Sequence, residues 1–218
     1  MRNGLWPSAR GFHSQCGVLR MVSVMLLSIA SCLLLAGCVF PGGVKPTVKI
    51  GLSAPFEGLY RDQGYEALHA VRLAVRQRNE AGGIGASYWV ELVALNDFDE
   101  PTEAIIQAQK MAVDSDLMGV LGGWSVETAQ AVAPEYERLG LAVLTPMTEP
   151  KGCPVFQANP AFREAYMALS GGAPPATIAS WTYGATNCLL DALDTAAQTE
   201  GRPSRSGVQR ALRREQSR

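Results

Sequence analysis

Short apolar runs alternate along this chain with longer amphipathic stretches, and this alternation constrains the fold more than any other feature. The runs, which are typical of strands, begin at Val48, Tyr88, Leu117 and Leu141. The stretches with apolar residues three or four positions apart lie at about 64–80, 101–112 and 125–139. Such spacing is typical of helices. Strands that alternate with helices in this way pair in parallel, so we predict a doubly wound, mostly parallel α/β sheet.

Each predicted helix carries an apolar stripe on one face. The stripes are Ala67, Leu68, Val71, Ala74 and Val75; Ala104, Ile105, Ala108, Met111 and Ala112; and Val132, Ala133, Tyr136 and Leu139. Gly82 and Gly83 end the first stretch and Pro101 opens the second, as expected at helix boundaries. We expect the three stripes to pack against the sheet.

The first 37 residues are typical of an export signal. They contain three arginines and no acidic residue, followed by an apolar run from Met21 to Leu35. This run is shorter than the roughly 20 residues that span a bilayer. The sequence LAGC ends at Cys38 and resembles a lipobox, in which the chain is cut before the cysteine and its thiol takes lipid. We predict a lipoprotein whose acyl chains, palmitate among them, are attached at Cys38 and anchor it to a bacterial membrane. The protein would face the periplasm or the cell exterior. The alternative is an ordinary signal peptide followed by a chance cysteine.

The rest of the chain divides into a tether, one domain and a tail. Residues 38–47 are rich in Gly and Pro and read as a short tether. Residues 48–199 are long enough to bury one core. Residues 200–218 are rich in arginine. This basic tail either touches anionic lipid near the anchor or forms a solvated last helix or a frayed end.

Charge and cysteine content exclude several classes of function. The chain has 19 basic and 20 acidic residues, and loss of the signal removes three arginines, so the mature chain is acidic and unsuited to nucleic acid. Besides Cys38, the mature chain holds only Cys153 and Cys188, which form one disulfide or remain two free thiols. His69 is its single histidine, which argues against a zinc site. We predict no metal and no cofactor.

No motif points to catalysis. The sequence GGWSVE at 122–127 lacks the second glycine of a nucleophile elbow and has no histidine to serve as base. The glycines at 82–85 follow a helix and precede a strand, the reverse of a dinucleotide loop. Acidic side chains at Asp97, Asp99, Glu100 and Glu103 crowd a helix start, where they interact favourably with the helix dipole; a calcium site is the alternative. We predict that the chain is not an enzyme.

Four segments between about residues 47 and 149 carry a family resemblance. They are VKIGLSAPFEG, LAVRQRNEAGGIG, NDFDEPTEAIIQAQKM and GVLGGWSVETAQAVAPEYERLGLAVLTPMTE. Together they resemble the start of the branched-chain amino-acid, or leucine-type, substrate-binding proteins of ABC transporters, which are type I periplasmic binding proteins. Residues 159–196 resemble the late segment in which that family returns to its first lobe. Around residues 150–156 this chain has only a few residues where the family has a second lobe. The resemblance therefore implies a single lobe.

The resemblance also implies a half-site for a ligand carboxylate, at residues 125–128 and 147–149. The candidate ligand-binding residues are Ser125, Thr128, Thr145, Thr148 and Tyr60. The first two lie where a helix start favours an anion, and the threonines follow the next strand. Glu149 would repel a carboxylate if it faced inward. The alternative is that Ser125 is a helix N-cap, the threonines end a strand, and Tyr60 is a surface aromatic.

The first functional hypothesis is a solute-binding lipoprotein of an ABC-type amino-acid transport system in reduced, one-lobe form, with a permease as partner. Closure of two lobes on the ligand is not available to it. The second hypothesis is a membrane-anchored interaction or scaffold module that self-associates through an exposed apolar surface. The third is a non-functional, internally deleted copy of such a receptor.

Overall fold

The computed structural model describes residues 45–148 and 153–215; the expected signal peptide, Cys38 and Glu149 lie outside these ranges. The strands are β1 (Thr47–Ala54), β2 (Trp89–Asn96), β3 (Leu117–Leu121) and β4 (Ala142–Leu144). They form one sheet in the order β2-β1-β3-β4, and every pairing is parallel. The predicted parallel α/β sheet is confirmed.

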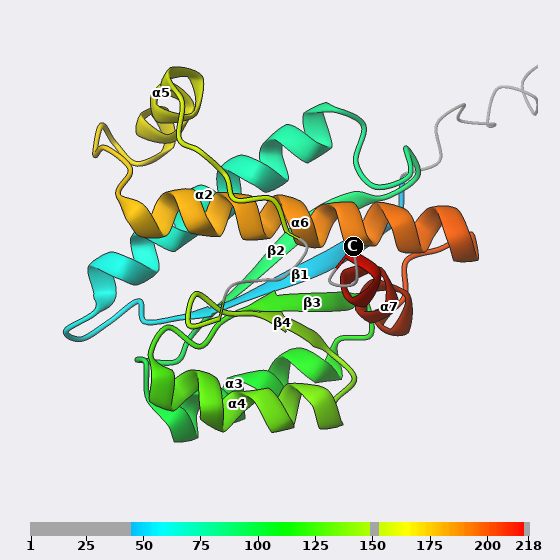
Figure 1. Cartoon of the computed structure of the whole chain (residues 1–218), viewed down its shortest axis with the longest axis horizontal. Coiled ribbons are helices and arrows are strands. Elements are labelled where there is room, and N and C mark those ends of the chain that lie inside the picture. The colour runs from blue at the N-terminus through cyan, green and yellow to red at the C-terminus, as the bar shows by residue number, and fades with distance from the viewer. Residues whose placement is uncertain (1–44, 149–152, 216–218) are drawn as a thin grey trace, which may run out of the picture. The chain divides into compact units, whose positions relative to one another are not determined.

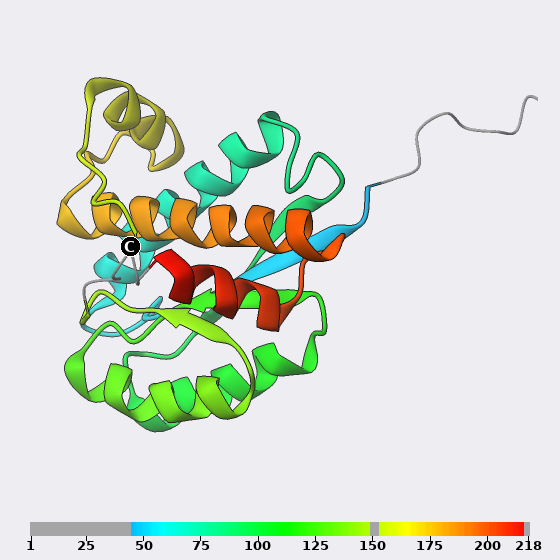
Figure 2. The ribbon, with the colours of Figure 1, turned by 45° about the vertical axis from the view of Figure 1, so that its right-hand side comes forward.

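Helices cover both faces of this sheet. They are α2 (Arg61–Glu80), α3 (Pro101–Val113), α4 (Val126–Arg138), α5 (Pro160–Leu169), α6 (Thr177–Glu200) and α7 (Arg205–Glu215). Helices α2 and α6 lie on one face, and α3 and α4 lie on the other (Figure 1). Helix α7 runs beside α6 and contacts β3 and β4 (Figure 2). The sheet is thus enclosed on both sides, which is why its central strand is almost entirely buried.

The main core lies between the sheet and the layer of α2 and α6. Val48, Ile50 and Leu52 of β1 are at most 2% exposed and pack there. All five residues of the predicted α2 stripe are buried in the same cluster. On the other face, Gly51 allows α3 to approach β1 closely, because a Cβ atom at this position would lie 2.7 Å from the Met111 sulfur.

Helix α4 differs from its predicted apolar stripe at one position. In α4 the buried residues are Thr128, Val132 and Tyr136, which are four positions apart. Ala133 is exposed, so its place in the predicted stripe was wrong. One residue advances the helix by about 100°, which turns Ala133 away from the face that Val132 buries.

The C-terminal helices complete the core. Leu189, Leu190 and Leu193 of α6 are fully buried. Helix α7 lies within the segment expected to be a basic tail, and its Val208, Ala211 and Leu212 belong to the same core cluster as β1 and α2. Its first residue, Arg205, donates hydrogen bonds to the carbonyls of Ala112, Asp114 and Leu117. Helix α7 is therefore packed on the domain.

A disulfide joins Cys153 to Cys188, with 5.6 Å between their Cα atoms. Of the two alternatives for these cysteines, the structure has the paired one. Where the family resemblance implies a second lobe, the described residues between β4 and α5 form no helix or strand. The disulfide attaches this connection to the middle of α6.

We predict that Cys153→Ser lowers the free energy of unfolding by about 3–4 kcal/mol, because the bridge closes a loop between cysteines 35 residues apart. Urea unfolding of residues 45–218 under oxidising conditions measures the difference. Reductant should lower the stability of the unsubstituted chain to a similar value and leave the variant unchanged. Equal midpoints for the oxidised and reduced forms of the unsubstituted chain would contradict the prediction.

Candidate functional site

The carboxyl ends of the four parallel strands meet at one edge of the sheet, on the left of Figure 1. The loops there comprise residues 55–60, 97–100, 122–125 and 145–148. We call these loops, with the first turn of α4, the ligand edge. Ligands of open α/β sheets bind beyond this edge, because the loops and helix N-termini converge there.

Ser125 and Thr128 are joined at the start of α4. Ser125 is the N-cap, and its hydroxyl oxygen accepts a hydrogen bond from the Thr128 amide at 3.2 Å. Thr128 is fully buried, and its hydroxyl donates to the Asp99 carbonyl at 3.0 Å. The structure therefore gives Ser125 the capping role of the alternative interpretation. A ligand would reach the half-buried Ser125 and the first turn of α4, but not the enclosed Thr128 hydroxyl.

Thr145, Thr148 and Tyr60 lie elsewhere on the same edge. The Thr145 hydroxyl donates to the Gly123 carbonyl at 2.6 Å and accepts from the Met147 amide. It thus fastens the end of β4 to the end of β3. Thr148 is exposed, and Tyr60 is 45% exposed just before α2. The structure brings Ser125 and Thr128 together, whereas Thr148 and Tyr60 lie on the surface at the ends of two different strands.

Asp99 is a site residue that sequence reasoning missed. Phe98 and Asp99 both have a φ of 56°, a left-handed conformation that is uncommon outside glycine. This turn places the Asp99 carboxylate 3.0 Å from the Ser125 hydroxyl oxygen. The ligand edge therefore holds an acidic group, which the sequence pattern had suggested only as a partner of the helix dipole. The signal for it was the group of turn-forming residues Asn96, Asp97 and Asp99 at the end of a strand.

Asp97 lies beneath this site in the protein interior. Its carboxylate accepts a hydrogen bond from the Ser53 hydroxyl at 2.7 Å and from the Asp99 amide at 3.0 Å. Trp124 donates to the Ser53 carbonyl. The side chain of Asp97 is fully buried. Burial raises the pKa of the Asp97 carboxyl, and the nearby Asp99 charge raises it further.

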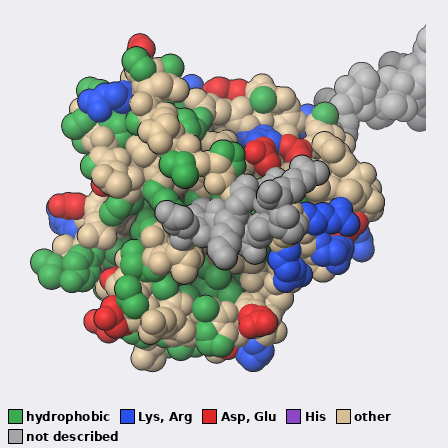
Figure 3. All heavy atoms as spheres, viewed as in Figure 1, with side chains coloured by type: hydrophobic (Ala, Val, Ile, Leu, Met, Phe, Trp, Pro, Cys, Tyr) green, Lys and Arg blue, Asp and Glu red, His purple; other side chains and the backbone are tan. Residues whose placement is uncertain are grey.

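Apolar side chains surround the polar groups. The exposed ones on the ligand edge are Leu59, Tyr60, Phe98, Val126 and Met147. Figure 3 shows hydrophobic side chains gathered on its left, over the loop that follows β1. The edge thus combines a helix start, a carboxylate and apolar surface. That combination suits a small amphiphilic ligand, and it also matches the exposed apolar surface of the second hypothesis.

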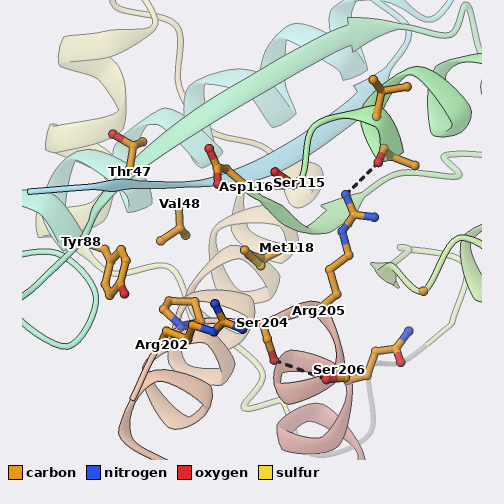
Figure 4. A pocket seen from close by; sticks show the side chains of 15 residues that line it. Thr47, Val48, Tyr88, Ser115, Asp116, Met118, Arg202, Ser204, Arg205 and Ser206 are labelled. Atoms are coloured by element: carbon orange, nitrogen blue, oxygen red, sulfur yellow. Dashed lines mark hydrogen bonds between the residues drawn. The ribbon is translucent and has the colours of Figure 1, made fainter. Parts of the chain in front are cut away.

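A groove of about 770 Å³ lies at the opposite edge, where the strands begin (Figure 4). Thr47, Val48 and residues 202–206 line it. It is therefore separate from the ligand edge. Over residues 45–148 and 153–215, no cluster of His, Cys, Asp and Glu could hold a metal ion. In the same ranges, every helix is too short or too polar to cross a membrane.

The parallel sheet and its two helical layers have the α/β fold of periplasmic binding proteins. The chain belongs to the periplasmic binding protein family, whose model matches residues 47–157. This family is non-enzymatic and acts outside the cytoplasm.

Two solved structures share the fold. One is a chain assigned as a branched-chain amino acid ABC transporter from Rhodospirillum rubrum, with a TM-score of 0.64 and 14% identity over 76% of this chain and 88% of that one. The other is the branched-chain amino acid transporter substrate-binding protein LivJ from Streptococcus pneumoniae in complex with isoleucine. Its TM-score is 0.62, with 13% identity over 76% of this chain and 87% of that one. No curated protein matches the chain.

Asp97 gives a prediction about pH. Because its pKa is raised in the folded state, Asp97 favours folding below its unfolded pKa, and this contribution is lost as pH rises through the folded pKa. Asp97→Asn has no such titration. The stability of the variant relative to the unsubstituted chain should therefore increase with pH, by at most about 1.4 kcal/mol per pH unit. Urea unfolding over the acidic to neutral range measures it.

Asp114→Asn is the control with the opposite sign. A hydrogen bond from Lys49 lowers the pKa of the Asp114 carboxyl. Its contribution to stability is present above the unfolded pKa and is lost as pH falls. The relative stability of this variant should therefore decrease as pH rises. The same pH trend in both variants would show that Asp97 is not the source of the effect.

Proposed function

We propose that this protein is a solute-binding lipoprotein of an ABC-type amino-acid transport system, in a reduced form with one lobe. Membership of the periplasmic binding protein family supports the receptor class. The observation that carries the proposal is the pairing of Ser125 and Asp99 at the ligand edge. A helix start and a carboxylate lie side by side there, next to exposed apolar side chains of the same edge.

The chemistry of this edge fits a zwitterionic ligand. The first-turn amides of α4 lack carbonyl partners within their own helix and favour a carboxylate. The Asp99 carboxylate attracts an ammonium group. Leu59, Phe98 and Met147 offer apolar contact for a side chain. A branched-chain amino acid or a related amide combines these features, and the LivJ structure holds isoleucine, a ligand of this kind.

The affinity should be weak, since the proposed site is open to water and lacks the ligand contacts that a second lobe would supply. We expect a dissociation constant of about 1 mM or higher, which corresponds to about −4 kcal/mol. A weak, open receptor works where solute is abundant or where a permease completes the site. An ABC permease is accordingly the proposed partner.

The proposed location follows from the amino-terminal sequence. In this proposal residues 1–37 are removed, Cys38 carries lipid, and residues 38–47 tether the domain at 48–199 and its basic segment 200–218 to the membrane. The LAGC sequence supports the anchor, and the extracytoplasmic family supports export. The ligand edge then faces the periplasm or the cell exterior.

Ligand binding is tested on residues 45–218, which form a compact unit. At about 20 mM leucine or isoleucine, a dissociation constant of about 1 mM stabilises the fold by about 1.8 kcal/mol. The melting temperature should rise by several degrees. Ser125→Ala and Asp99→Asn should each reduce the rise, since one weakens the carboxylate site and the other the ammonium site.

Asn159→Ala is the matched control. Asn159 is the N-cap of α5 and accepts from the Phe162 amide at 2.9 Å. Its loss should cost about 1 kcal/mol, as at Ser125, but leave the ligand-induced rise intact. Saturation at micromolar ligand would contradict the half-site, and no rise would contradict ligand binding. A stable dimer that covers Leu59 and Phe98 would favour the second hypothesis instead.

Lipidation is tested in bacteria grown with labelled palmitate. The full chain should take up label and partition into detergent, and Cys38→Ser should abolish both because the thiol that forms the thioether is gone. Cys153→Ser is the control, because this thiol is paired in the folded domain. Equal labelling of the Cys38→Ser chain would show that Cys38 is not the anchor.

A further inference from the structure

Helix α7 has two dissimilar faces. Val208, Ala211 and Leu212 are buried in the main core, whereas Arg210, Arg213 and Arg214 are exposed. Between residues 202 and 214 the sequence holds five arginines and no Asp or Glu. We call the exposed side chains of Arg202, Arg210, Arg213 and Arg214 the basic face. Figure 3 shows Lys and Arg side chains gathered over α7.

Acidic side chains offset part of this charge. Arg210 pairs with Glu200, which precedes α7. Asp116 and Arg202 both line the groove, and Asp114 is bound to Lys49 at 2.7 Å. Arg205 is not part of the basic face, because its guanidinium binds three backbone carbonyls at the end of α3 and the start of β3. The basic face is therefore a local positive patch on a chain that is acidic after processing.

The position of the basic face indicates its partner. Thr47 and Val48, at the start of β1, line the same groove as residues 202–206 (Figure 4). The Lys45 ammonium lies 4.4 Å from the centre of the nearby Trp89 ring. The described chain thus begins at the edge that carries the basic face. The 44 residues before it contain the apolar run from Met21 to Leu35.

We propose that the basic face docks on the anionic headgroups of the membrane to which the amino-terminal segment directs the protein. Arginines within a Debye length of such a surface are attracted to it, each changing the partition coefficient roughly fivefold. The start of β1 and the basic face lie at the same edge of the fold, so one orientation brings both toward the membrane. That orientation turns the ligand edge away from the bilayer. The docking does not depend on which solute the ligand edge binds.

The test is arginine footprinting of the full chain with phenylglyoxal and mass spectrometry. The chain is mixed with an excess of phosphatidylcholine vesicles, either pure or with about 30% phosphatidylglycerol as the anionic lipid. Modification of Arg202 and Arg213 should fall severalfold with the anionic vesicles only. Salt at about 0.5 M should restore it by screening. Arg163 of α5 is exposed outside the basic face and should react equally throughout.

A double variant, Arg210→Gln with Arg213→Gln, tests whether Arg202 is protected because the whole basic face docks on the vesicle or because a lipid binds at Arg202 alone. Protection of Arg202 by anionic vesicles should be lost in this variant and kept in the matched pair Arg72→Gln with Arg163→Gln, which removes the same charge from exposed positions on α2 and α5. Equal reactivity of Arg202 with both vesicle types would overturn the proposal. Protection by heparin but not by anionic vesicles would overturn it in favour of a polyanionic macromolecule.

Discussion

The packing of α6 over β1 and α2 is the interaction on which the remaining structure depends. Leu189, Leu190 and Leu193 fill the face of the sheet that α2 leaves open, and the same cluster receives the apolar side of α7. Each fully buried leucine contributes roughly 1.5–3 kcal/mol. Because this helix follows the connection that carries Cys153, the sheet is covered by segments that lie far apart in sequence. The described residues therefore cover both faces of the sheet by themselves.

Much of this fold could be predicted from the sequence, because the burial of a parallel sheet leaves a strong periodic pattern. The five-residue stripe of α2 is buried as predicted. The error at Ala133 arose where apolar residues are adjacent and the pattern does not fix which one faces inward. The sequence left open whether α7 packs on the domain and whether Cys153 pairs with Cys188. Both depend on contacts between segments that are far apart in sequence.

The candidate site was less predictable. The sequence places Ser125 at a helix start, and the structure agrees. It does not reveal that two residues after β2 adopt left-handed conformations, which bring Asp99 to Ser125 and send Asp97 into the core. Asp97 and Asp99, two positions apart, therefore lie in opposite environments. One is available to a ligand, and the other is a buried carboxyl with a raised pKa. Only the tertiary path of the loop separates them.

The polarity of a parallel sheet sets the relation between the two ends of the molecule. All four strands start at the edge with the groove and the basic face, and all end at the ligand edge. The eight residues of β1 span about 26 Å, roughly three Debye lengths at physiological salt. A charged surface at one edge is therefore screened from a charged ligand at the other. In the proposed function, attachment and solute binding take place at opposite edges of the sheet because the strand direction keeps them apart.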